Sequence, residues 1–234
     1  MQIKNTLNRI RCWFRQQVDR VRYSRKRWLG IDEKIFIIGR NKTGTTSLEK
    51  LFRSLGYVVG PQIVAESMLP DYAKRDFRAL LAFCDTAEVF QDAPFSWPET
   101  YLHLYQRYPN AKFVLTIRDN SEQWYRSLVQ FHKNVVKSDG TPSAEDLANH
   151  HYRWKGFLLE VQKIVYGATN QSLYDKNLYI QSYEDHNRAV QLFFSGKKNF
   201  LCMNLADANS AEKLSEFLNI DKAKIVIPHV NKTQ

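Results

Sequence analysis

Short apolar runs alternate with longer stretches of helical periodicity along most of the chain. The apolar runs predict strands over residues 34–39, 57–59, 88–91, 112–118 and 200–204. Apolar residues spaced three or four apart predict helices over residues 45–55, 71–84, 98–107, from 121 onward, 144–166, 183–194 and 211–218. Strands separated by helices are typical of a parallel sheet with helices on both faces. We therefore expect an α/β fold, with residues 31–234 as one domain.

The first 30 residues show a separate amphipathic pattern, in which apolar residues recur at helical spacing and basic residues fill the other face. The apolar positions are Ile3, Leu7, Ile10, Phe14, Val18 and Val21. This pattern predicts a basic N-terminal helix over residues 1–30. Such a helix can lie on an anionic membrane surface, or it can pack against its own domain or a partner, and the pattern leaves both readings open.

The net charge of +10 is concentrated in this segment. Residues 1–30 carry nine basic side chains and one acid, which is a net charge of +8, and the rest of the chain carries only +2. The α/β domain is therefore almost neutral. Its charge does not indicate a nucleic-acid partner.

The three cysteines, Cys12, Cys84 and Cys202, are odd in number and widely spaced. They predict neither a disulfide framework nor a zinc site, and no other metal-binding cluster stands out. A reducing compartment is the simplest inference, so we expect a cytoplasmic protein that is peripheral to a membrane if the N-terminal helix binds lipid. No apolar stretch has the length of a transmembrane helix or the form of a signal peptide.

The most informative stretch is IFIIGRNKTGTTSLEKLF, residues 35–52, where a predicted strand runs through a glycine-containing loop into a predicted helix. Gly39 and Gly44 allow a close approach of the backbone to a bound anion. The first N–H groups of the helix point toward such an anion, and Lys42 adds a positive charge. Four hydroxyls can also donate to it, those of Thr43, Thr45, Thr46 and Ser47. The stretch predicts a phosphate or sulfate site.

This P-loop-like arrangement differs from the site of a nucleoside triphosphatase or kinase. In a Walker loop the second glycine precedes a lysine and a Ser or Thr, but here Gly44 precedes Thr45. The strand predicted over residues 112–118 ends in Arg118, whereas a Walker site needs an Asp there for Mg²⁺. A small-molecule kinase is therefore the weaker alternative, and a non-catalytic nucleotide- or polyanion-binding protein is another.

GRNKTGTTSL resembles the 5′-phosphosulfate loop of sulfotransferases, enzymes that use 3′-phosphoadenosine-5′-phosphosulfate (PAPS) as donor. KFVLTIRDNSEQWYRSL resembles their 3′-phosphate signature, with Arg118 at the strand end and Ser127 on the helix. The resemblance implies PAPS as co-substrate without a metal, bound by Arg40, Asn41, Lys42, Thr43, Gly44, Thr45, Thr46, Ser47, Arg118 and Ser127. Ser127 lies nine residues after Arg118, one more than is usual in the family, so Ser121 and Arg126 remain alternatives.

Two further segments are similar to those of a bacterial glycan-type branch of the family, YRWKGF (152–157) and PHVNK (228–232). This likeness implies a carbohydrate or glycolipid hydroxyl as the acceptor. It also implies that Asn231 and Lys232 close over the donor from the C-terminal tail.

The resemblance implies two catalytic residues. Lys42 would stabilise the charge that develops on the bridging oxygen, and Asp92, in VFQDAPFSW, would be the general base. Phe90, Phe95 and Trp97 offer an apolar setting that can raise the pKa of Asp92. Asp before Pro94 is equally typical of a turn. The histidines that could serve as base instead are His132, His150, His151 and His229.

Overall fold

The computed structural model describes residues 17–137 and 139–228. Its strands are β1 (Ile35–Ile37), β2 (Val89–Gln91), β3 (Lys112–Ile117) and β4 (Phe200–Asn204). They form one sheet in the order β2-β1-β3-β4, and every neighbouring pair is parallel. The α/β fold with a parallel sheet is confirmed. The strand predicted over residues 57–59 is reduced to an isolated bridge between Val59 and Val89.

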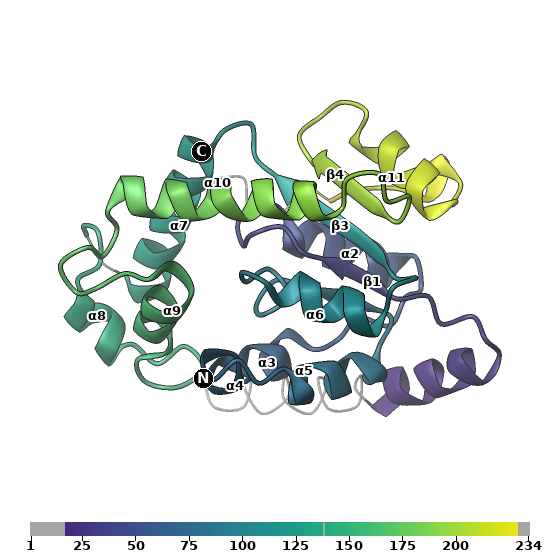
Figure 1. Ribbon diagram of the computed structural model, residues 1–234, viewed down its shortest axis with the longest axis horizontal. Helices are drawn as coiled ribbons and strands as arrows, with labels where there is room; N and C mark the ends of the chain where they lie inside the picture. The colour runs from purple at the N-terminus through teal and green to yellow at the C-terminus, as the bar shows by residue number, and fades with distance from the viewer. Residues whose placement is uncertain (1–16, 138, 229–234) are drawn as a thin grey trace.

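Helices connect the strands and lie on both sides of the sheet (Figure 1). Before β3 they are α2 (Thr45–Ser54), α3 (Gln62–Glu66), α4 (Leu69–Ala73), α5 (Arg78–Phe83) and α6 (Thr100–Arg107), with a 3₁₀ turn at Cys84–Thr86. After β3 they are α7 (Ser121–Val136), α8 (Ala144–Asn149), α9 (Phe157–Tyr166), α10 (Lys176–Phe193) and α11 (Ser210–Leu218), with a 3₁₀ turn at Lys222–Lys224. Residues 17–28 are also helical. None of the helices in the described part of the chain combines the length and apolar character needed to cross a bilayer.

Several predicted helices differ from those observed. The helix predicted over residues 71–84 is split into α4 and α5, because Arg75 adopts a left-handed φ of 59° between them. The helix predicted over residues 144–166 is interrupted by a turn that ends at Gly156. This glycine is the N-cap of α9 and has a φ of 89°. The helix predicted from residue 183 begins earlier, where Asp175 accepts a hydrogen bond from Leu178 N (2.8 Å) and caps α10. The pattern did not predict α3.

The alternation of side chains along the strands builds two cores, one on each face of the sheet. Phe36 and Phe113, which are paired across β1 and β3, point to the face that carries α6, α7 and α10. Ile37 and Val114 point to the face covered by α2 and α11. Because both faces are buried, the parallel strands have no polar side.

The register of the sheet also fixes where the connecting loops meet. Ile37 is in register with Gln91 on one side and with Val114 on the other. The segments that follow β1, β2 and β3 therefore leave the sheet at the same edge. Ligands of such sheets bind there, beyond the carboxyl ends of the strands.

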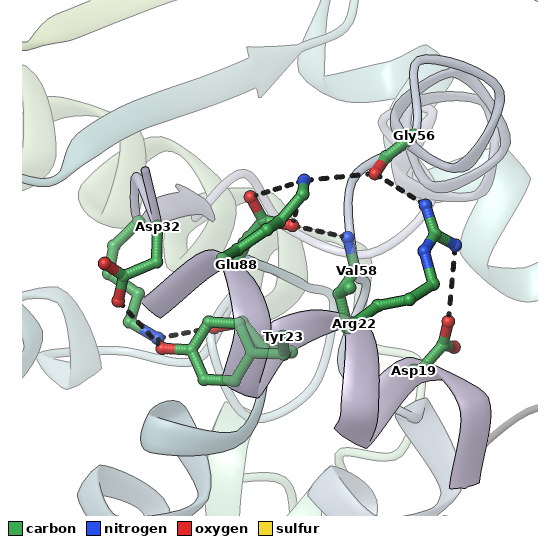
Figure 2. A network of polar contacts seen from close by, with 10 residues as sticks. Asp19, Arg22, Tyr23, Asp32, Gly56, Val58 and Glu88 are labelled. Carbon is green, nitrogen blue, oxygen red and sulfur yellow. Dashed lines mark hydrogen bonds and ion pairs between the residues drawn. The ribbon is translucent and has the colours of Figure 1, made fainter. Parts of the chain in front are cut away.

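The helix at residues 17–28 is attached to the domain by polar contacts (Figure 2). Lys26 Nζ donates to the buried carboxylate of Glu88 (2.8 Å) and to the carbonyl of Gly56 (3.1 Å). Arg22 donates to the same carbonyl (3.0 Å), and Tyr23 is buried against the domain. This part of the predicted N-terminal helix therefore packs on its own domain, but through its polar side.

The predicted apolar stripe does not take part in that packing where the structure describes it. Val18 and Val21 are 55% and 71% exposed. The other predicted positions of the stripe, from Ile3 to Phe14, lie outside the described residues.

We predict that Lys26→Met destabilises the protein by about 1–3 kcal/mol, because it leaves the buried Glu88 carboxylate without its cation. Urea denaturation of the full chain measures the effect. Arg25→Met is the matched control, since Arg25 is exposed on the same helix. Equal stabilities of the two variants would show that the ion pair contributes nothing.

Candidate active site

A cavity of about 580 Å³ lies where β1, β2 and β3 end. The structure brings most of the predicted site residues to its wall, namely Asn41, Lys42, Gly44, Thr45, Thr46, Ser47, Asp92, Arg118 and Ser127. They come from the loop after β1, the start of α2, the residue after β2, the residue after β3, and α7. Segments that lie far apart in the sequence thus meet around one space.

Two predicted donor-binding residues, Arg40 and Thr43, do not line the cavity. The buried Arg40 side chain donates to Ser182 Oγ (2.6 Å) on α10, and its guanidinium lies over the ring of Tyr166 (5.0 Å). Thr43 Oγ1 donates to the carbonyl of Arg40 (2.5 Å) and lies 2.6 Å from Thr116 Oγ1. Both side chains therefore stabilise the loop through contacts within the protein and do not face the cavity. Asn231 and Lys232, with His229, lie outside the described residues.

The two loop glycines are required by close packing. A Cβ on Gly39 would lie 2.3 Å from the backbone oxygen of Thr116 on β3. Gly44 has a φ of 101°, and a Cβ there would lie 2.3 Å from Leu205 Cδ1. The sequence assigned these glycines to anion approach, whereas the structure shows that a side chain at either position would also disturb the packing of the loop.

Gly44 is also the N-cap of α2, whose first turn has no capping side chain and no acidic residue. The helix dipole and the first N–H groups of α2 therefore act on the cavity, and the Asp92 carboxylate contacts this turn through the hydroxyl of Thr45 (3.1 Å). This arrangement is suited to a bound phosphate or sulfate group.

Lys42 contributes the positive charge of this loop. Its backbone has a left-handed φ of 67°, and its Nζ lies 4.1 Å from the centre of the Phe131 ring. Burial lowers the pKa of Lys42, the nearby Asp92 raises it, and Arg118 lowers it further. A left-handed non-glycine residue is strained, and such strain tends to occur at functional sites.

Arg118 connects the loop to the end of β3. Its Nε donates to the carbonyl of Lys42 (2.6 Å), and its backbone N–H donates to the hydroxyl of Tyr183 (3.0 Å). Trp124 Nε1 donates to the carbonyl of Asn41 (2.8 Å), so α7 is tied to the same loop. The two predicted anion-binding segments therefore form one unit.

Ser127 lies at the cavity wall despite its unusual spacing from Arg118. Asn120 caps the helix by accepting from Gln123 N (2.8 Å), and Ser127 is buried at the cavity wall. The alternatives point elsewhere, since Ser121 Oγ donates to Glu184 (2.7 Å) and Arg126 is exposed. Of these three candidates, only Ser127 lines the cavity.

Asp92 lies directly after β2 with a left-handed φ of 58°. Its carboxylate accepts hydrogen bonds from Ala93 N (2.9 Å) and from the hydroxyl of Thr45 (3.1 Å), at the first turn of α2. Burial raises the pKa of Asp92, while the Ala93 hydrogen bond and the positive charge of Lys42 oppose the rise. A carboxylate of this kind is a better base at neutral pH than an exposed one.

His132 is the histidine on the cavity wall, and it differs from Asp92 in basicity. Its Nδ1 lies 2.8 Å from the hydroxyl of Tyr174. Burial lowers the pKa of His132 to about 3, and Lys42 adds to the effect, so the ring is neutral and weakly basic. His150 and His151 do not line the cavity. The electrostatics favour Asp92 as base.

One side of the cavity was predicted only in part, since the segment 152–157 was singled out by its resemblance but Gln62, Glu66 and Gln91 were not. Gln62 and Glu66 on α3 line it, as do Gln91 at the end of β2 and Tyr152 and Arg153 in the turn before α9. We call these five residues the acceptor wall. The position of Gln91 at a strand end could have indicated its role, but nothing in the pattern indicated α3. No cluster of metal-binding side chains occurs within the ranges 17–137 and 139–228.

A family model described as a sulfotransferase domain matches residues 34–234. Because the match covers most of the chain, the chain belongs to the sulfotransferase domain family. It is an enzyme that transfers a sulfuryl group from PAPS to an acceptor hydroxyl. The match disfavours a P-loop kinase and a non-catalytic binding protein. A search of curated proteins found no significant match.

We predict that Gly44→Ala lowers the affinity for the product 3′-phosphoadenosine 5′-phosphate (PAP) by about tenfold or more, because a left-handed alanine costs about 1–2 kcal/mol before any clash with Leu205. Calorimetric titration measures the affinity. Gly196→Ala is the control, with a φ of 75° but no atom within 4 Å of the added Cβ. Unchanged PAP binding by Gly44→Ala would contradict the assignment of this loop.

Proposed function

We propose that the enzyme sulfates a hydroxyl of a carbohydrate or glycolipid, with the donor and the acceptor meeting in the cavity at the ends of β1, β2 and β3. The observation that carries this proposal is the convergence of Lys42, Asp92 and Arg118 on one space, at the N-terminus of α2. The same space holds an anion-binding helix end, two cations and a partly buried carboxylate. Each of these groups can serve sulfuryl transfer, by binding the anionic donor, stabilising the leaving oxygen or accepting the proton of the acceptor.

The donor is proposed to lie along the loop after β1. The first turn of α2, including the backbone N–H of Thr45, and the hydroxyls of Thr46 and Ser47 would bind the 5′-phosphosulfate, while Arg118 and Ser127 would bind the 3′-phosphate. The structure supports this division because Arg118 is fixed to the loop through the carbonyl of Lys42. Arg40 and Thr43 would act indirectly, by holding the loop in place. We also propose that Asn231 and Lys232, in the C-terminal tail, bind the donor.

The proposed reaction is a direct in-line transfer. The acceptor oxygen forms a bond to sulfur as the bond from sulfur to the bridging phosphate oxygen breaks, which gives PAP and a sulfate ester. Asp92 takes the proton of the acceptor hydroxyl. Lys42 stabilises the negative charge on the leaving oxygen, a type of interaction worth about 3–4 kcal/mol in comparable sites.

The proposal of a glycan acceptor rests on the likeness of two segments to the bacterial glycan-type branch. One of them, YRWKGF, contributes Tyr152, Arg153 and Phe157 to the cavity wall. Trp97 adds a further aromatic surface there. Aromatic and polar side chains together are typical of sites that bind small organic ligands.

We further propose that residues 1–30 are an appendage to a catalytic domain of residues 31–234, in a cytoplasmic protein that contacts anionic membranes. The described part supports this proposal, since Val18, Val21 and Trp28 are 55%, 71% and 84% exposed. The exposed Arg20 and Arg27 lie on the same helix. An apolar strip beside basic side chains suits a lipid surface of negative charge.

We predict that Asp92→Asn lowers kcat by about 10²–10⁴-fold while PAP affinity is kept, because a positioned base contributes a factor of this order. Transfer of ³⁵S from labelled PAPS to a carbohydrate extract measures it. Asp207→Asn, outside the cavity, is the control.

The raised pKa of Asp92 also predicts how the activity depends on pH. The base acts when deprotonated, so activity is present above the raised pKa of Asp92 and is lost as the pH falls through it. This acid limb should lie above the range of an ordinary carboxyl group and disappear in Asp92→Asn. If Asp92→Asn kept both wild-type turnover and the acid limb, the base would be another group.

We predict that replacing Val18, Val21 and Trp28 by serine reduces binding to phosphatidylserine-containing vesicles several-fold, because the apolar contact is lost. Vesicle co-sedimentation measures it. Replacing Leu192 and Val226 by serine is the control, since these side chains are 77% and 72% exposed elsewhere. Equal vesicle binding by the triple variant and the wild type would exclude a membrane role for this strip.

A further inference from the structure

The acceptor wall differs in charge from the rest of the cavity. Lys42 and Arg118 lie in the proposed donor site. Of the described residues that line the cavity, Arg153 is the one cation that remains for the acceptor. Asp92 and Glu66 lie on that side as well, so the acceptor faces more acidic than basic side chains.

Arg153 is already engaged by a carboxylate of the wall. Its Nε donates to Glu66 Oε2, in an ion pair that joins α3 to the turn before α9. Its guanidinium also lies over the ring of Tyr152, 4.4 Å from the centre. These two contacts orient the guanidinium toward Glu66. A negative group on an acceptor would have to break the pair to reach it.

The carboxylates of this region add an unfavourable field for a second anion. Burial raises the pKa of Glu66 to about 7, Arg153 opposes the rise, and Asp92 adds to it. Glu66 is therefore partly ionised at neutral pH, and its remaining negative charge adds to that of Asp92. An anionic acceptor would face this repulsion in addition to that of the bound donor, and like charges at close range select strongly against a ligand.

Gln91 supplies a hydrogen-bond acceptor that has no partner. Gln91 lines the cavity, its side chain is 4% exposed, and its Oε1 is buried without a hydrogen bond. The amide is held in place because Nε2 donates to Gln62 Oε1 (3.2 Å), while Gln62 Nε2 donates to the carbonyl of Ala93 (2.7 Å). A buried unpaired oxygen is costly, so a ligand hydroxyl that donates to it gains affinity.

We propose that the acceptor is an uncharged polyol, which places its reacting hydroxyl at Asp92 and donates a neighbouring hydroxyl to Gln91 Oε1. Gln91 and Asp92 both line the cavity, so two hydroxyls of one molecule can reach them together. Acceptors with a carboxylate, sulfate or phosphate beside the reacting hydroxyl are disfavoured by the nearby carboxyl groups of Asp92 and Glu66. This inference rests on the proposed function and narrows its acceptor class.

The test is transfer of ³⁵S from labelled PAPS to matched pairs of acceptors that differ in one charge. Suitable pairs are methyl glucoside with methyl glucuronide, methyl galactoside with methyl galacturonide, and glycerol with glycerate. We expect the neutral member of a pair to be sulfated about tenfold faster or more. Glu66→Gln should lower the ratio of the two sulfation rates, neutral to charged, because it removes a negative charge and releases Arg153.

A second variant tests the hydrogen bond to the polyol. Gln91→Leu should raise KM for the neutral polyol about tenfold and leave PAP affinity unchanged. Gln181→Leu is the control, because this exposed glutamine lies outside the cavity. Retention of the wild-type KM by Gln91→Leu would refute the role of Gln91.

The outcomes separate this inference from the proposed function. Faster sulfation of the charged members would overturn the acceptor class, and so would the absence of label on every polyol while PAP still binds. Failure of the wild-type protein to bind PAP would instead refute the donor site, and the acceptor class would fall with it.

Discussion

The hydrogen bond from the Arg118 guanidinium to the carbonyl of Lys42 is the contact on which the arrangement of the site depends. It joins the loop after β1 to the end of β3, so the two proposed anion-binding segments hold one geometry. Trp124 reinforces the junction through the carbonyl of Asn41. Together these contacts keep Lys42 in a left-handed conformation, which costs a residue other than glycine about 1–3 kcal/mol.

Burial shifts the titration of the cavity residues in opposite directions. It raises the pKa of the carboxyl groups of Asp92 and Glu66, and it lowers the pKa of His132 to about 3. The same loss of solvent therefore makes a carboxylate more basic and a histidine less so. This difference supports the proposal that Asp92, and not the buried His132, is the base.

The sequence predicted the sheet well, because β3 and β4 are apolar runs bounded by polar or turn residues. It also predicted which loops meet, since the carboxyl ends of parallel strands share one edge. Of the acceptor wall it indicated only Tyr152 and Arg153, through the segment 152–157, and it did not predict Gln62, Glu66 or Gln91. Glu66 lies on a helix too short to show periodicity, and its partner Arg153 is 87 residues away. The roles of Arg40 and Thr43 could not be separated from those of their neighbours, because side-chain direction in a loop leaves no pattern.

The site is proposed above all to recognise a donor that carries both a 5′-phosphosulfate and a 3′-phosphate. Titration of PAP and AMP without Mg²⁺ tests it most directly, because AMP lacks only the group assigned to Arg118 and Ser127. The account predicts that PAP binds about 100-fold more tightly, since two charge-assisted hydrogen bonds of about 1.5 kcal/mol or more are lost with AMP. Equal affinities for PAP and AMP would contradict it.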